Sequence, residues 1–324
     1  MTEQVQPSAV DGLFNHPKTL PTWLLYDDLG SQIYTRITGL PEYYLTRAEA
    51  EIFEQQGERI VARALAGAGE VSIVELGAGS SEKTELFLRA VVRAHGNLVH
   101  LACDIERGAL ELGVARLREA FPQSDVRGFV GTHEAAGAAI AELAGRQLVL
   151  FIGSSIGNLS DEQATAMLRA LRTRLRSDGG LLLGTDLKKQ PERLLAAYDD
   201  AAGVTAQFTL NILTRLNREL DADFKLEHFR HVACWNAQAS DIEIYIESTQ
   251  AQTVSIGRVD RTVSFTAGER ILVEISAKYD LERVERLLRA AGFERAETFV
   301  DSAGDFAVHL ARCLPLTELA VAIE

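Results

Sequence analysis

The chain has 324 residues, 47% of them hydrophobic, which is enough for two domains with well-filled cores. Lys and Arg number 33 against 46 Asp and Glu, and the formal charge of -13 would repel a phosphate backbone. We therefore expect a small-molecule substrate and no nucleic-acid partner. The expected oligomeric state is a monomer, by default.

The cysteines and the first residues of the chain indicate the cellular compartment in which the protein works. Cys103, Cys234 and Cys313 are widely separated and odd in number, so they form neither a disulfide framework nor a zinc-ligand spacing. The chain starts without the basic and apolar regions of a signal peptide, and its apolar runs fall short of the roughly 20 residues that span a bilayer. We expect a cytoplasmic protein with no membrane partner.

The first two thirds of the chain predict a sheet with helices on both faces. Aromatic residues are dense over 21–44, which we interpret as short helices and turns, and Thr46 with Glu49 has the pattern of a capping box opening a helix over 46–65. Another capping box, at Ser160 and Gln163, opens a later helix. The alternation predicts a doubly wound, mostly parallel sheet. Its strands are expected at 71–76, 98–104, 126–130, 148–152 and 181–186, with further helices at 81–94 and 110–120.

The pattern changes after residue 186. A helix through Tyr198 gives way to less regular sequence, and then to alternating segments at 243–247, 253–256, 263–265 and 271–276 that predict one antiparallel sheet, interpreted as an inserted lid. The earlier alternation returns with a helix over 281–291, which Gly292 ends, and with strands near 296–300 and 306–311.

A glycine turn between the first strand and its helix is the first candidate site. Gly77 and Gly79 permit positive φ and close backbone approach, while the following helix N-terminus offers free N–H groups. Such a turn holds a dinucleotide phosphate or an amino-acid carboxylate, or serves tight packing alone. A dinucleotide fingerprint requires a third glycine where this chain has Glu82, which disfavours a nicotinamide oxidoreductase.

Acidic residues favour a different ligand for this turn. Glu75 before the glycines and Asp104 at the end of the second strand match the pattern of Rossmann-like methyltransferases that use S-adenosylmethionine. Asp104 is expected to accept hydrogen bonds from both ribose hydroxyls, and Lys83 to neutralise the methionine carboxylate. No metal is expected, because the seven histidines do not cluster, and His228 with His231 is interpreted as a solvated surface.

Longer strings extend the resemblance to one family. The chain resembles the histidine-specific Nα-methyltransferases that make the histidine betaine precursor of ergothioneine, in colinear order from about residue 21 to 310. The strings are YDDLGSQIYTRITGLPEYYLTRAEA, VELGAGSSEKT, FIGSSIGNL, LLLGTDL, AYDDAAGVTAQF, NRELDADF and the triplet Glu274-Ile275-Ser276. The resemblance implies a Rossmann-like class I methyltransferase domain (48–187 and 279–324) and an α+β substrate-binding domain (1–47 and 188–278), with the active site between them.

The resemblance also implies roles for single residues. Tyr43 is expected to contact the substrate imidazole, and Glu274 and Ser276 to hold it, while Asn158 and Tyr198 bind the substrate carboxylate. Packing for Tyr43 and Tyr198 and helix capping for Asn158 are the structural alternatives. The cofactor contacts carry over to Gly77, Lys83 and Asp104.

The adenine end departs from the family pattern. Where the family has an acidic residue followed by an aromatic one, this chain has Thr132 and His133, which are expected to accept a hydrogen bond and to stack, respectively. Tyr26 and Tyr34 are candidates for holding a quaternary ammonium product, because aromatic faces attract such groups.

The chemistry requires positioning rather than a catalytic side chain. Methyl transfer from a sulfonium to a neutral amine is an in-line displacement, so no catalytic residue is assigned. The expected function is Nα-methylation of L-histidine, up to the trimethylated betaine (hercynine). Two alternatives stay open at this point: an enzyme for another amino acid, aromatic or indole, and a module that binds S-adenosylmethionine without turnover.

Overall fold

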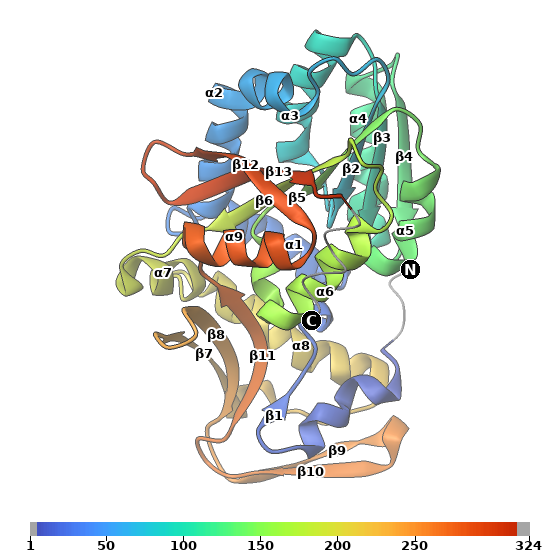
Figure 1. Ribbon diagram of the computed structural model, residues 1–324. Helices are drawn as coiled ribbons and strands as arrows, with labels where there is room; N and C mark the ends of the chain where they lie inside the picture. Colours follow the sequence, from blue (N-terminus) through green and yellow to red (C-terminus); the bar gives the residue numbers. More distant parts are fainter. Residues whose placement is uncertain (1–4, 316–324) are drawn as a thin grey trace. The chain divides into compact units, whose positions relative to one another are not determined.

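The computed structural model describes residues 5–315, which divide into two compact units, each made from two chain segments (Figure 1). Unit 1 contains the described residues up to Tyr44 and the segment Lys189–Ala277. Unit 2 contains Leu45–Lys188 and the described residues from Lys278 onward. The sequence places the domain boundaries after residues 47, 187 and 278. That unit 1 binds substrate and unit 2 binds the methyl donor stays a prediction.

Unit 2 is built on one sheet, with seven strands in the part of the chain that the structure describes. Its order is β12-β13-β6-β5-β2-β3-β4. Neighbours from β6 to β4 are parallel, whereas β13 runs antiparallel to both β6 and β12. The mostly parallel sheet is therefore confirmed. The strands are β2 (Val71–Leu76), β3 (Val99–Asp104), β4 (Asp125–Val130), β5 (Arg146–Phe151), β6 (Gly180–Asp186), β12 (Phe293–Val300) and β13 (Phe306–Cys313).

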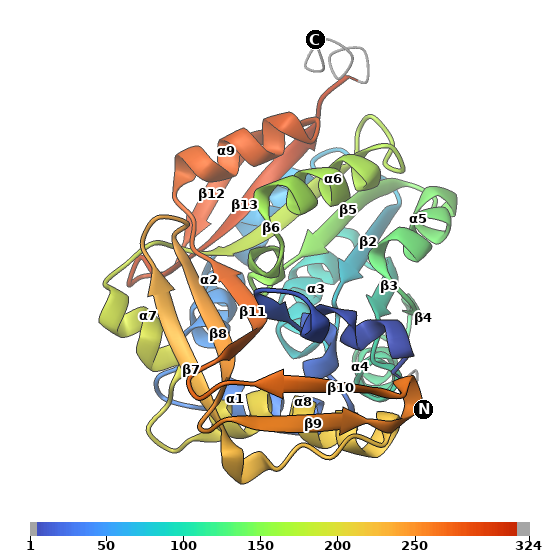
Figure 2. The same ribbon diagram turned by 90° about the horizontal axis from the view of Figure 1, so that it is seen from below.

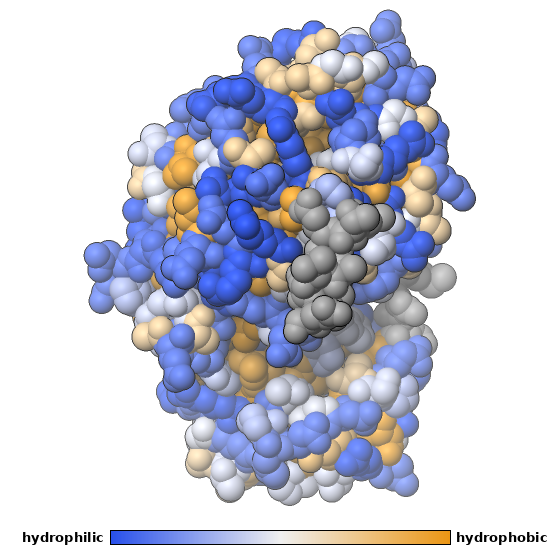
Figure 3. All heavy atoms as spheres, viewed as in Figure 1, coloured by the Kyte–Doolittle hydropathy of each residue, from blue (hydrophilic) through white to orange (hydrophobic). Residues whose placement is uncertain are grey.

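Helices cover both faces of this sheet, with α2, α3 and α4 on one face and α5, α6 and α9 on the other (Figure 2). Each buries an apolar stripe: in α9, Val284, Leu287 and Leu288 are buried. The surface around α9 and β12 is mostly hydrophilic, with small hydrophobic patches (Figure 3). The helices are α2 (Leu45–Ala64), α3 (Glu82–His95), α4 (Arg107–Ala120), α5 (His133–Glu142), α6 (Asp161–Arg172) and α9 (Leu281–Ala290).

Unit 1 combines a mixed sheet, a hairpin and three α-helices in its described residues. The sheet order is β1-β11-β8-β7, with β1 parallel to β11 and the other pairs antiparallel. The strands are β1 (Lys18–Thr19), β7 (Phe229–Asn236), β8 (Asp241–Ser248) and β11 (Arg270–Ala277), and the hairpin is β9 (Gln252–Ile256) with β10 (Arg261–Phe265). The helices are α1 (Asp28–Thr38), α7 (Pro191–Tyr198) and α8 (Val204–Leu220).

Three parts of the predicted layout are wrong. The segment interpreted as irregular contains the 17-residue helix α8 and the strand β7, and α5 follows β4 where no helix is predicted. The expected single antiparallel sheet is instead two, because β9 and β10 form a separate two-stranded sheet in the described residues. The signal for α8 is present in the sequence: apolar residues recur every four positions, a period that helices bury on one side. They are Val204, Phe208, Ile212, Leu216 and Leu220.

Across residues 5–315, none of the helices has the length and hydropathy required to cross a membrane.

Candidate active site

The glycine turn of unit 2 follows β2 at the carboxyl edge of the sheet, where ligands bind in open α/β folds. Gly77 has φ +73° and Gly79 has φ +48°. A Cβ on Gly79 would meet no atom within 4 Å, and one on Gly77 only Ser155 Oγ at 4.0 Å. Packing therefore does not explain these glycines, whereas left-handed backbone and an open approach for a ligand do.

Glu75, just before this turn, is 2% exposed and holds the turn to α3. Its carboxyl group accepts a hydrogen bond from Thr84 Oγ1 and one from Ser81 Oγ at 3.1 Å. Ser81 itself has left-handed backbone, with φ +52°. Burial raises the pKa of Glu75 to about 8, although the bonds from Thr84 and Ser81 lower it. Glu75 thus fixes the shape of the loop from inside.

Asp104 ends β3 beside the turn and ties it to the next loop. Its Oδ2 accepts the Gly79 N–H at 2.8 Å, and its Oδ1 accepts the Glu106 N–H at 2.8 Å. Burial and the charge of Glu106 raise its pKa, while the two backbone bonds lower it. A carboxylate has about four acceptor positions, so each oxygen has one beyond its backbone hydrogen bond.

Lys83, on the first turn of α3, has an acidic partner that the sequence did not indicate. Its ammonium donates to Glu49 Oε2, and Glu49 is fully buried on α2. The Glu49 carboxylate also accepts the Gly153 N–H, at 2.8 Å to Oε1 and 3.1 Å to Oε2. The predicted capping role of Glu49 is wrong, because both oxygens are engaged at the carboxyl edge of the sheet.

The adenine-binding prediction falls at the start of α5. Thr132 is its N-cap, and the hydroxyl oxygen accepts the Ala135 N–H at 3.3 Å. The His133 ring packs edge-on against Phe151, with centroids 5.4 Å apart. Burial lowers the pKa of His133, and the charges of Glu134 and Asp104 oppose this only partly. A neutral imidazole near Asp104 suits an adenine ring, and Thr132 has a second role as a cap.

Asn158 ends the short helix η3 (Ser155–Asn158) that follows β5. The next helix, α6, is capped by Ser160, whose capping box with Gln163 is present as predicted. Asn158 is half-buried, and its amide makes no hydrogen bond within residues 5–315. The capping alternative for Asn158 is therefore unsupported, and its donor group is available to a ligand.

Unit 1 gathers four aromatic residues from its two chain segments, which we call the aromatic cluster: Tyr26, Tyr34, Tyr43 and Phe208. Tyr34 packs edge-on against Tyr26 at 5.7 Å and against Tyr43 at 6.3 Å between ring centroids. Phe208, on α8, closes the group at 5.4 Å from Tyr26. Burial raises the pKa of Tyr43 well above its usual value, so its hydroxyl stays protonated.

Tyr198 and Ser276 are hydrogen-bonded to each other, although they are predicted to bind different parts of the substrate, the carboxylate and the imidazole. Tyr198 Oη and Ser276 Oγ are 2.8 Å apart and buried. Tyr198 also packs edge-on against Tyr43, with centroids 6.3 Å apart. Glu274 lies two positions before Ser276 on β11 and is half-buried, so both side chains point to one face of the strand. Four of the predicted substrate residues thus lie together in unit 1.

His231 contradicts the prediction of a solvated surface. Its ring is partly buried, with Nε2 2.9 Å from the Tyr198 carbonyl oxygen and Nδ1 3.0 Å from Thr209 Oγ1. Burial lowers its pKa, and the bond to Tyr198 opposes this. The side chain joins β7 to the end of α7 and to α8, so it supports Tyr198. No pattern in the sequence separates such a histidine from a surface one.

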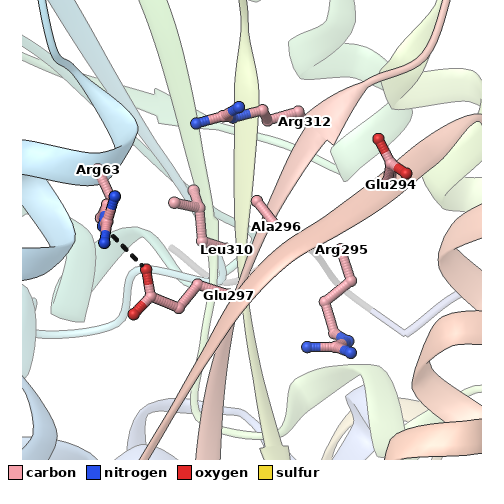
Figure 4. Close-up of a pocket in the computed structure, with 7 residues that line it drawn as sticks. All are labelled: Arg63, Glu294, Arg295, Ala296, Glu297, Leu310 and Arg312. Carbon is pink, nitrogen blue, oxygen red and sulfur yellow. Dashed lines mark ion pairs between the residues drawn. The ribbon is translucent and has the colours of Figure 1, made fainter.

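A polar pocket of about 420 Å³ lies elsewhere in unit 2 (Figure 4). Arg312 pairs in register with Gly180, the first residue of β6, so the pocket is at the amino end of the parallel strands, opposite the glycine turn. Arg63 and Glu297, which face each other there, are 3.2 Å apart. Arg295, also on its wall, pairs with Glu285, and the pocket takes no part in the candidate site. The described residues contain no group of three His, Cys, Asp or Glu that would hold a metal ion.

Comparison with known proteins identifies the family. A sequence profile described as a histidine-specific, SAM-dependent methyltransferase matches residues 5–313. The chain is 41% identical to the histidine N-alpha-methyltransferase of Mycolicibacterium smegmatis over 300 residues, covering 93% of this chain and 92% of that protein. For the histidine N-alpha-methyltransferase of Mycobacterium tuberculosis the identity is 40% over 301 residues, with 93% and 92% covered. Ergothioneine biosynthesis protein 1 of Neurospora crassa is 29% identical over 300 residues, 91% of this chain and 33% of that protein.

The chain therefore belongs to the family of histidine-specific, S-adenosylmethionine-dependent methyltransferases. It is an enzyme whose methyl donor is S-adenosylmethionine, and the resemblance drawn from its sequence strings is confirmed. The roles of single residues are not tested by these comparisons and stay predictions.

Proposed function

We propose that this methyltransferase transfers methyl groups to the α-amino nitrogen of L-histidine, up to the trimethylated betaine that serves ergothioneine biosynthesis. In this proposal unit 2 binds the donor, and the residues for the amino acid belong to unit 1 except Asn158, which belongs to unit 2. The observation that carries it is the pair of Tyr198 and Ser276, hydrogen-bonded at 2.8 Å, with Glu274 two positions away on the same strand. Tyr198 can donate a hydrogen bond to the carboxylate of histidine, and Glu274 and Ser276 can bind its imidazole.

The donor side is supported by the residues around the glycine turn. Asp104 has acceptor positions for two ribose hydroxyls, Lys83 carries the charge for the methionine carboxylate, and His133 offers an uncharged ring for adenine. When bound, S-adenosylmethionine supplies an electrophilic methyl group on a sulfonium. Gly77 and Gly79 leave the backbone open on the side where the donor would lie.

On the acceptor side, each part of histidine has a partner of the matching kind. Asn158 and Tyr198 donate to the carboxylate, Glu274 accepts the imidazole N–H, and Ser276 serves the other ring nitrogen. The Tyr43 hydroxyl stays protonated and lies 3.3 Å from the Tyr34 hydroxyl. It therefore offers the substrate imidazole an uncharged polar group.

The chain is expected to act by positioning. The reacting amine must be neutral with its lone pair along the line of the bond that breaks, and burial beside a sulfonium lowers an amine pKa. Complete methylation removes every N–H, so fixed acceptors cannot hold the product nitrogen. The faces of Tyr26 and Tyr34 attract a quaternary ammonium by roughly 0.5–2 kcal/mol without requiring a hydrogen.

We expect specificity for histidine to come from two polar groups of β11, the half-buried Glu274 and the buried Ser276. Ser276 is 4% exposed, and Ile244, which faces Glu274 across the sheet, is 1% exposed. A histidine ring offers the Glu274 carboxylate an N–H donor that an aliphatic side chain lacks, a difference on the order of 1–3 kcal/mol.

The test is incubation with labelled S-adenosylmethionine and each common amino acid in turn. We expect label on histidine, with mono-, di- and trimethylated products separated by mass. Preferred transfer to tryptophan or tyrosine would contradict histidine as the substrate, and donor binding without transfer to any amino acid would contradict catalysis.

A further inference from the structure

Glu49 is a charged group of the candidate site for which the sequence predicts only a capping role and no part in binding. It lies on α2, and its side chain is fully buried. Its two oxygens contact two other parts of unit 2: the Lys83 ammonium on α3 and the Gly153 N–H after β5. One carboxylate thus joins three segments that all reach the carboxyl edge of the sheet.

Two glycines make room for this carboxylate. A Cβ on Gly184, in the middle of β6, would lie 2.4 Å from Glu49 Oε1, closer than any side chain tolerates. A Cβ on Gly153, which has φ +73°, would lie 3.3 Å from Lys83 Nζ. A side chain at Gly184 would therefore displace the Glu49 carboxylate, and one at Gly153 would crowd the Lys83 ammonium.

The pair has one buried and one accessible end. Glu49 is 0% exposed, whereas the Lys83 side chain is 25% exposed. A buried carboxylate is tolerated only when it is paired and hydrogen-bonded, and here the lysine and a backbone N–H meet that need. Lysine has a flexible stem with several rotamers, so a fixed anion behind its ammonium restricts where the positive charge lies.

We propose that Glu49 is a positioning residue with two effects. It fixes the Lys83 ammonium where the donor's carboxylate binds. Through the Gly153 N–H it also fixes the loop between β5 and η3, the short helix whose last residue is Asn158. This inference rests on the proposed function for the roles of Lys83 and Asn158. Glu49 itself contacts neither substrate. Its effect on donor binding passes through the lysine, and its effect on the loop passes through the Gly153 N–H.

A double-mutant cycle on donor binding tests the first effect. Glu49→Gln, Lys83→Gln and the double variant are titrated by calorimetry with S-adenosylhomocysteine, which has the donor's amino-acid end without a transferable methyl group. We expect each single change to weaken binding about tenfold and the double variant to bind like Lys83→Gln alone. Wild-type affinity in Glu49→Gln, or effects that multiply to about a hundredfold in the double variant, would overturn the proposal.

Amide hydrogen exchange in the donor-free protein tests the second effect. Gln keeps an acceptor for the Gly153 N–H and Ala does not, so protection at Gly153 should persist in Glu49→Gln and disappear in Glu49→Ala. Protection that survives in Glu49→Ala would overturn the loop assignment. A wild-type circular dichroism spectrum and a cooperative thermal transition establish that the Gln variant is folded.

The matched control is Glu58→Gln, on the same helix. Glu58 is 77% exposed and pairs with Arg93 at the surface, so its change should leave donor affinity and Gly153 exchange at wild-type values. Since the calorimetry uses no acceptor, these outcomes stand apart from the proposed function. If histidine were not methylated by the wild type, the proposed function would fail while the cycle still decided the role of Glu49.

Discussion

The two units differ in how their candidate residues come together. In unit 2, Gly77, Gly79 and Lys83 lie within seven positions of the chain, and Asp104 ends the adjacent parallel strand. In unit 1, Tyr43 and Tyr198 come from different chain segments, and Ser276 lies 78 positions after Tyr198 in the same segment. A donor site common to many substrates can be a local motif, whereas a site for one amino acid is assembled from distant residues. Substitutions in the two units should therefore separate donor binding from acceptor recognition.

Glu274→Ala is the strongest test of this separation. Loss of the imidazole's acceptor should lower kcat/KM for histidine about 100-fold, equal to about 2.7 kcal/mol, because a buried ring N–H would lose its partner. Donor affinity by calorimetry should not change. The control is Glu243→Ala on the neighbouring strand β8, whose carboxylate is bound to Asn236 and Tyr245. Unchanged histidine turnover in Glu274→Ala would remove the imidazole assignment.

Asp104→Ala is the reciprocal change in unit 2. Two charge-assisted hydrogen bonds to the ribose are lost, and we expect donor Kd to rise about 50-fold, or roughly 2.3 kcal/mol. The control is Asp125→Ala, at the start of the neighbouring strand β4, where the carboxylate pairs with Arg127 at the surface. An unchanged donor Kd in Asp104→Ala would contradict the ribose role.

The stability of unit 2 should depend on pH through His309, which is buried between Thr185 and Thr298. Burial, with a smaller effect of Arg295, lowers its pKa to about 3 in the folded chain. The unfolded chain binds a proton near pH 6.5, so the folded state loses stability from this group as the pH falls from 6.5 toward 3. Between pH 6.5 and 4.5 the loss is about 2 kcal/mol.

This contribution is measured by comparing urea unfolding of wild type and His309→Gln at pH 6.5 and 4.5. The variant should lose about 2 kcal/mol less over that interval. An equal pH dependence in wild type and His309→Gln would show that His309 does not stay neutral when folded.

Tyr198→Phe should give the smallest effect and locates the acceptor more finely. It removes one hydroxyl from the 2.8 Å contact with Ser276. We expect KM for histidine to rise about fivefold, since one neutral hydrogen bond contributes about 1 kcal/mol. Tyr245→Phe, which removes a hydroxyl bound to Glu243, is the control. A change in donor affinity with an unchanged KM for histidine would contradict the assignment of Tyr198 to the amino-acid substrate.

Local patterns determined much of this protein in advance. The strands of the parallel sheet, the capping box at Ser160 and the glycine turn with Asp104 all depend on residues close in sequence or on adjacent strands. Backbone geometry and the hydrophobic period depend on residues close together in the sequence, so they can be predicted without knowledge of the fold. The family followed from strings in colinear order, which is likewise a property of the sequence alone.

Only the tertiary structure determined which side chains are buried and which distant residues they contact. Glu49 has the spacing of a capping residue, and its burial beside Lys83 and Gly184 arises only because α2 packs against α3 and β6. His231 gives no sign in the sequence that it holds the carbonyl of Tyr198. A side chain's charge partner and its removal from water are set by segments far away in the chain, and these decide whether the same residue caps a helix, faces solvent or shapes a site.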